Sequence, residues 1–122
     1  MKGKEIKNMS KIMGVQKTSN ASIYIFTKDE DFFSKILRFL IELGLKDAEG
    51  SLGEYVNDKL TFPNPIRLID VRKQIKNENY DVHLIFGYKR IFMIISSKEN
   101  RQKEISNILF KYFKIKSVKN KF

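Results

Sequence analysis

The stretch 51–97 constrains the fold most, because it combines helix-start signals with a strongly marked β-hairpin. At its beginning, Ser51 and Glu54 have the Ser-x-x-Glu spacing of a capping box. In such a box each side chain accepts a hydrogen bond from a backbone N–H group that the first helical turn leaves without a partner. The spacing therefore predicts a short helix over residues 51–60.

A second helix is predicted directly afterwards, over residues 65–76. Asn64 is a good helix cap, and Pro65 suits the first helical position because the N–H that proline lacks would have no partner there. In a helix, Leu68, Val71 and Ile75 would pack inward. The polar side chains left facing outward, which could reach base edges and phosphates, are Arg67, Asp70, Lys73, Gln74 and Lys76.

The hairpin that follows joins strands expected over 80–86 and 91–96. Both are rich in β-branched and aromatic residues, and the turn Gly87-Tyr88-Lys89-Arg90 separates them. Upstream, the apolar run 22–27 is typical of a strand buried on both faces. A helix over Asp29–Leu43 is expected next, with Thr27 and Glu30 as a second capping box and Gly44 as its end.

This order of elements resembles the winged helix-turn-helix DNA-binding domains. The helices over 29–43 and 51–60 would precede a recognition helix over 65–76, and the hairpin would be the wing. The resemblance implies that the recognition helix enters the major groove, while Lys89 and Arg90 at the tip of the wing contact the backbone. The expected fold is an α+β domain with a winged-helix-like core, an extra N-terminal strand and a C-terminal helix.

Length and composition favour one domain without a cofactor. The 122 residues suffice for one core, and residues 1–20, which show no periodicity, are expected to be a flexible basic arm before a single domain over 21–122. The absence of cysteine, with His83 as the only histidine, argues against thiolate or imidazole metal sites. No apolar stretch matches a membrane span or signal peptide, so a cytoplasmic location without membrane partners is expected.

The net charge of +10 is unevenly distributed. Residues 18–61 carry five basic against eight acidic side chains, whereas residues 62–97 carry six against three and residues 98–122 eight against two. Such asymmetry fits a domain that turns one face to a polyanion. Nucleic acid, with DNA favoured over RNA, is the expected partner, and an acidic protein is the alternative.

A last helix is expected after a third capping box, Ser96 and Glu99. Its apolar residues recur at helical spacing from Ile105 to Phe113, but Phe110 lies off this stripe beside Lys103 and Lys114. An aromatic residue among lysines can stack on an unpaired base. It can also pack against a second copy, so a homodimer through this helix or the broadly apolar helix 29–43 is a further expectation.

The same residues allow a competing interpretation in which 66–73 is a strand. The order then becomes helix, three strands, helix and strand, and Asp81 followed by Ser96-Ser97-Lys98 resembles the PD-(D/E)xK nuclease core. That active site needs a second carboxylate two residues before the lysine to hold a divalent metal. Ser96 stands there instead, so this interpretation predicts a degenerate nuclease-like domain.

The sequence thus predicts a non-enzymatic, basic nucleic-acid-binding protein with no catalytic or metal-binding residues. Its expected contacts come from the helix 65–76, the hairpin tip and the last helix. A small inhibitor or adaptor, encoded by a mobile element and bound to a nucleic-acid-processing complex, would show the same lysine-rich surface and stays open as an alternative.

Overall fold

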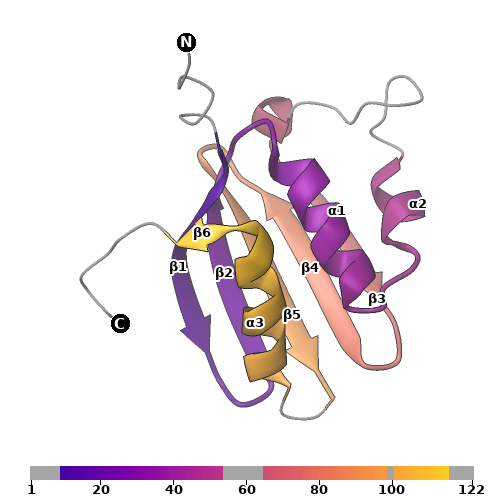
Figure 1. The fold of residues 1–122 in the computed structure, drawn as a ribbon. Coiled ribbons are helices and arrows are strands. Elements are labelled where there is room, and N and C mark those ends of the chain that lie inside the picture. Colours follow the sequence, from indigo (N-terminus) through magenta and orange to yellow (C-terminus); the bar gives the residue numbers. More distant parts are fainter. Residues whose placement is uncertain (1–8, 54–64, 99–100, 116–122) are drawn as a thin grey trace.

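The computed structural model describes residues 9–53, 65–98 and 101–115, and their strands form one six-stranded sheet (Figure 1). The strand order is β3-β4-β5-β2-β1-β6, and all neighbours are antiparallel except β1 and β6. The strands are β1 (Lys11–Lys17), β2 (Ala21–Thr27), β3 (Val71–Lys76), β4 (Tyr80–Phe86), β5 (Arg90–Ser97) and β6 (Lys114–Ile115). The helices are α1 (Phe32–Glu42), α2 (Ala48–Gly53), the 3-10 helix η2 (Pro65–Arg67) and α3 (Gln102–Tyr112).

The helices α1 and α3 lie side by side on one face of the sheet (Figure 1). Alternate residues of the central strands point to these helices and are buried, such as Tyr24 and Phe26 on β2. Their neighbours Ile23 and Ile25 point to the opposite face and are only partly buried. No helix in the described ranges lies over that opposite face, which we call the open face. None of the described helices is long and apolar enough to cross a membrane.

Aromatic side chains join the two layers of the core. The ring of Phe32 on α1 lies 5.3 Å from that of Phe26, 6.0 Å from that of Phe86 and 5.9 Å from that of Phe113, centroid to centroid. Edge-to-face contacts of this kind add to the free energy that burial alone provides. Phe32 of α1 and Phe113, at the C-cap of α3, therefore fix both helices against β2 and β4.

The wide apolar surface of α1 is buried almost entirely within one copy of the chain. Five of its residues are buried against the sheet and α3: Phe32, Phe33, Ile36, Phe39 and Leu40. Among the described residues of α1, only Ile41 is a large exposed apolar side chain. The breadth of this arc thus no longer argues for a homodimer, which stays a prediction based on Ile41 and Phe110.

The helix expected over residues 65–76 is wrong. Only Pro65–Arg67 is helical, and Val71–Lys76 forms β3, which pairs with β4 along its whole length. Asp70, with φ of 62°, separates the two segments, and a positive φ is incompatible with a continuous right-handed helix. The alternative order of helix, three strands, helix and strand is confirmed, but the strand that it placed at 66–73 covers Val71–Lys76 instead.

The flexible arm expected over residues 1–20 is wrong for its second half. Lys11–Lys17 is β1, which pairs with β2 and buries Ile12. A β-bulge at Met13, between the pairs of Ile12 and Gly14, interrupts the alternation of side chains. The bulge leaves little alternation of apolar and polar residues in the sequence, and the strand is defined by its pairing with β2. Residues 1–8 lie outside the described residues.

Of the three predicted capping boxes, Thr27 and Glu30 lie wholly within the described residues and do not form a box, whereas Glu54 and Glu99 of the other two lie outside the described residues. The helix α1 begins at Phe32 with Asp31 before it, and Thr27 instead accepts a hydrogen bond from the Lys11 backbone N–H at 2.9 Å. Ser96 belongs to β5, and α3 begins only at Gln102. The helix predicted over 51–60 is confirmed at residues 51–53, which belong to α2, but α2 begins earlier, at Ala48, and residues 54–60, including Glu54, lie outside the described residues.

The α+β class and the hairpin are confirmed, but the hairpin does not project from the domain as a wing would. Its strands β4 and β5 occupy the centre of the sheet, between β3 and β2. The predicted end of α1 is also confirmed, because Gly44 has a φ of 94°, which glycine adopts without strain.

Candidate nucleic-acid interface

Six basic residues from three segments lie along one edge of the sheet and its adjoining end. We call this group the basic edge: Arg67, Arg72, Lys73, Lys76, Lys89 and Arg90. Strand β3 is the edge strand, and its alternation directs Arg72 and Lys76 to the open face and Lys73 to the other side. The two hairpin-tip residues, Lys89 and Arg90, close the turn from β4 to β5, where the Gly87 N–H donates to the Arg90 carbonyl at 2.9 Å.

Hydrogen bonds hold η2 and the start of β3 against the hairpin tip. The Lys28 ammonium donates to the Leu68 carbonyl at 2.6 Å and to the Gly87 carbonyl at 2.7 Å. The Asp70 backbone N–H donates to the Phe86 carbonyl at 2.8 Å. Burial lowers the pKa of Lys28. Arg67 and the tip residues are thereby brought to the same end of the molecule.

Acidic residues offset this charge only in part. Asp70 is exposed beside the tip, whereas Asp81 on β4 is already engaged. One Asp81 oxygen, Oδ1, accepts a hydrogen bond from Gln74 at 2.9 Å and lies 3.3 Å from His83 Nε2. The basic edge therefore keeps an excess of positive charge. The Gln74 amide is bonded to Asp81, so it is not a separate contact group for a ligand.

Two of the predicted site residues lie elsewhere. Lys103 is exposed on α3, and Lys114 is exposed on β6, the strand at the opposite edge of the sheet from β3. Phe110, the aromatic residue predicted to lie between them, is 41% exposed. Lys103 lies in the first turn of α3 and Lys114 beyond its last turn, so the fold joins neither of them to the basic edge.

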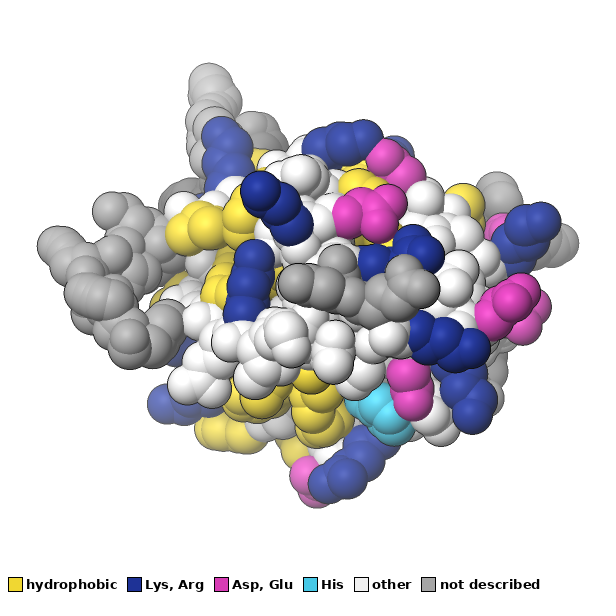
Figure 2. All heavy atoms as spheres, turned by 90° about the horizontal axis from the view of Figure 1, so that it is seen from below, with side chains coloured by type: hydrophobic (Ala, Val, Ile, Leu, Met, Phe, Trp, Pro, Cys, Tyr) yellow, Lys and Arg dark blue, Asp and Glu magenta, His cyan; other side chains and the backbone are white. Residues whose placement is uncertain are grey.

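The end of the molecule that carries the β3–β4 turn holds the residues of the nuclease-like pattern. Asp81 pairs opposite Ser96, and both line a hollow of about 260 Å³ together with Lys98. Basic and acidic side chains are mixed at this end (Figure 2). No group of three histidine, cysteine, aspartate or glutamate side chains in the described ranges could hold a metal ion. The pattern is thus brought together with Asp81 as its own carboxylate, and a second carboxylate of the hollow, Glu78, comes from the exposed β3–β4 turn and not from the position of Ser96.

Sequence reasoning missed a polar cluster beneath α3. The Tyr24 hydroxyl lies 2.8 Å from Ser106 Oγ, which also accepts a hydrogen bond from the Lys17 ammonium, and Ser22 donates to Gln102. Burial raises the pKa of Tyr24. A serine between a lysine and a tyrosine could act as a nucleophile. Tyr24 and Ser106 are buried, and only the outer members Lys17 and Ser22 border a hollow, so the cluster instead attaches α3 to β1 and β2.

The signal that could have revealed this cluster is a polar residue at an inward position. Ser22 lies two residues before Tyr24 on β2, in register with the buried side chains of that strand. A buried hydroxyl needs a hydrogen-bond partner. The inward position of Ser22 therefore indicates that the element covering this end of β2 carries a polar side chain.

Comparisons with protein-family models, with curated proteins and with solved structures find no match to this chain.

Proposed function

We propose that this protein binds nucleic acid through the basic edge and performs no chemistry of its own. The observation that carries the proposal is the convergence of Arg67, the cations of β3 and the hairpin tip, which lie apart in the sequence, on one side of the sheet. Basic side chains gathered in this way can replace the counterions that condense on a nucleic-acid backbone.

The proposed partner is still nucleic acid, but strand β3 takes the place of the expected recognition helix. Arg72 and Lys76 are four residues apart on an extended strand, a separation of roughly 13 Å, so they would contact separate phosphates. At the tip, Tyr88 is 76% exposed beside Lys89. An exposed aromatic ring next to cations suits stacking on a base as well as backbone contact. Strands can occupy a DNA groove in place of a helix, and duplex DNA is the first ligand to test.

The test is binding of the full chain to a duplex DNA and to the corresponding RNA and single strand, measured by fluorescence anisotropy at several salt concentrations. The variant K89A/R90A removes two predicted phosphate contacts. It should weaken binding to all sequences, and the slope of log affinity against log salt should fall by about 2.

The matched control is K103A/K114A, which removes the same charge from exposed lysines outside the basic edge. It should leave the slope within about 0.5 of that of the wild type if only local contacts matter. Equal effects of the two variants would mean that net charge alone drives binding. Absence of binding at low salt would overturn the proposal.

A second candidate is a nuclease-like domain that binds DNA without cutting it. It is supported by the shared hollow of Asp81, Ser96 and Lys98, with Asp81 paired opposite Ser96. We expect no cleavage in the presence of magnesium or manganese, because Ser96 offers no charged oxygen to a divalent ion. Cleavage that D81A abolishes would replace the first proposal with an enzymatic one.

A further inference from the structure

The open face carries a continuous apolar stripe. In one row across the sheet, Ile94 lies opposite Ile23, and in the next row Phe92 lies between Ile85 and Ile25. These five side chains project from β4, β5 and β2, and all are only partly buried. Strands that are apolar at successive positions are typical of sheets covered on both faces. The described elements cover one face only.

The stripe has a polar rim that is basic on the β3 side. Arg72 pairs with Ile85 and Lys76 with Asp81, while Arg90 lies beyond Phe92 on β5. Asp81, the one carboxylate that the described strands place on this face, lies opposite Lys76 and accepts a hydrogen bond from Gln74. Figure 2, which views the molecule end-on, shows hydrophobic side chains along the lower border, with the histidine, cations and acidic side chains around them. The rim therefore favours a ligand with negative charge beside an apolar surface.

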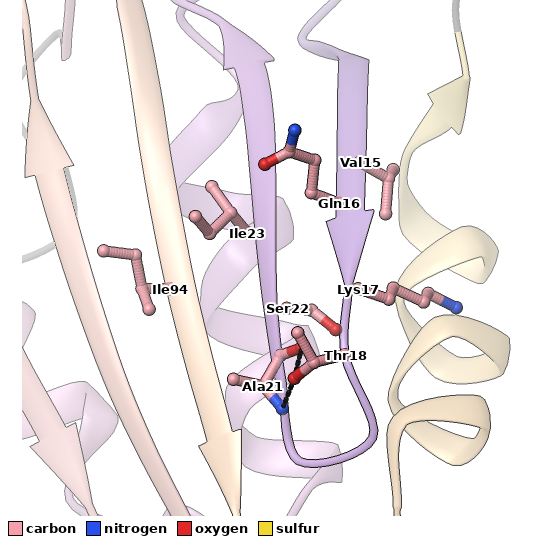
Figure 3. A pocket seen from close by; sticks show the side chains of 8 residues that line it. All are labelled: Val15, Gln16, Lys17, Thr18, Ala21, Ser22, Ile23 and Ile94. Atoms are coloured by element: carbon pink, nitrogen blue, oxygen red, sulfur yellow. Dashed lines mark hydrogen bonds between the residues drawn. The ribbon is translucent and has the colours of Figure 1, made fainter. Parts of the chain in front are cut away.

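A hollow of about 560 Å³ adjoins the stripe near the β1–β2 turn (Figure 3). Ile23 and Ile94 line it from the open face with Gln16, Thr18 and Ala21, and Val15, Lys17 and Ser22, whose positions on β1 and β2 alternate toward the helix side, complete the lining. The Thr18 hydroxyl and the Ala21 N–H form a hydrogen bond of 3.1 Å, which fixes the turn at its lower border. Such a hollow, beside a flat apolar surface, can receive one large apolar anchor side chain.

From these features we infer that the open face is the docking site of an acidic amphipathic helix from a protein partner. The two strands that flank β5 are roughly 10 Å apart, which matches the diameter of one helix. The apolar side of the helix would lie on the stripe and place an anchor in the hollow. Its acidic residues would then lie beside Arg72, Lys76 and Arg90.

Other occupants fit these observations less well. A second copy would bring two rims of net positive charge together, since an isologous interface places the same patch on both sides. The chain's own terminal segments 1–8 and 116–122 are also basic. A nucleic acid would meet the rim's charge, but four of the five stripe residues are aliphatic and offer its bases no ring on which to stack.

The experiment is a display selection against the full chain. The probe is a library of 18-residue helical peptides with leucine or phenylalanine allowed on one face and Asp, Glu, Lys, Arg or Ser on the flanks. Selected peptides should carry acidic flanks and an aromatic or leucine anchor. Their affinity should fall at least tenfold on I94T or I23T and at least threefold on R72Q, an exposed position that does not affect the core.

The matched control is I115T, which makes the same change at an exposed strand residue on β6. It should leave peptide affinity unchanged. Selection of basic peptides, no enrichment at all, or peptides lost on I115T and retained by I94T would overturn the inference. A nucleic acid that is lost on I94T would reassign the open face to that ligand. The proposed function uses the same cations Arg72, Lys76 and Arg90, but its salt-slope test does not depend on the stripe, so the effect of I94T distinguishes failure of this inference from failure of that proposal.

Discussion

The two faces of the sheet are built by the same strands, but α1 and α3 cover one of them and no described helix covers the other. On β5, Ile95 is buried beneath the helices, while its neighbour Ile94 lies on the open face beside the hollow. Both residues are isoleucines, so residue type alone does not predict which of them is buried. The difference shows that the apolar content of these strands exceeds what one helical layer covers, and the excess lies where a ligand can reach it.

The largest effect should come from testing this difference directly with one substitution at both positions. Ile95→Ala removes buried groups and leaves a cavity, so it should lower the free energy of unfolding by about 2–5 kcal/mol. Ile94→Ala removes groups that are partly solvated and should cost less than about 1.5 kcal/mol. Urea denaturation of both variants measures this contrast, and equal losses would show that the open face is covered in solution.

An intermediate effect is expected from Tyr24→Phe, which removes a hydroxyl from the polar cluster beneath α3. Ser106 keeps its contact with Lys17, so the loss should be about 1 kcal/mol at neutral pH. Burial raises the pKa of Tyr24 above its usual value of 10.0. Above that pH the unfolded tyrosine ionises while the folded one stays protonated, so stability falls with rising pH.

The phenylalanine variant lacks this titration and should lose stability less steeply between pH 9 and 11. Denaturant midpoints collected across that range provide the measurement. Parallel curves for the two proteins would mean that the Tyr24 hydroxyl is accessible to solvent.

The smallest effect concerns Glu42, which joins α1 to α3 through Lys111 and Tyr112. The hydrogen bond from Lys111, followed by that from Tyr112, lowers the pKa of Glu42. A carboxyl with a lowered pKa stabilises the fold above its usual pKa, and this stabilisation is lost as the pH falls through the lowered value. Glu42→Gln should therefore be slightly less stable than wild type at pH 7 and equal to it in strong acid. Thermal melts at both pH values check this, and a difference that persists in acid would contradict the ionic origin.

Strong local patterns predicted their elements correctly, and pairing between distant segments decided the rest. The apolar runs of β2, β4 and β5 and the apolar stripe of α3 needed no tertiary information to be recognised. Strand β3 was predicted as a helix because Leu68, Val71 and Ile75 also fit helical spacing, and only its ladder with β4 selects the strand. Strand β1 has little local pattern, because a bulge at Met13 interrupts its alternation and Ile12 is its one fully buried residue.

The candidate site was predictable in its residues more than in its arrangement. Lys89 and Arg90 follow from the hairpin turn, whose position depends on local sequence. That Arg72 would lie at one edge of the sheet and Lys114 at the other depends on the strand order, which no local pattern encodes. The open face was indicated by the run 22–27, since it was expected to be covered on both sides.

The position of the arginine and lysines of β3 also has a consequence for the protein at high concentration. An exposed edge strand can pair with the edge of another molecule and start a growing aggregate. Here one edge strand, β6, has only two residues, and the other, β3, carries Arg72, Lys73 and Lys76 among its six. Repulsion between like charges opposes stacking of one β3 on another, so the same side chains that favour a polyanion also keep neighbouring molecules from extending the sheet into fibrils.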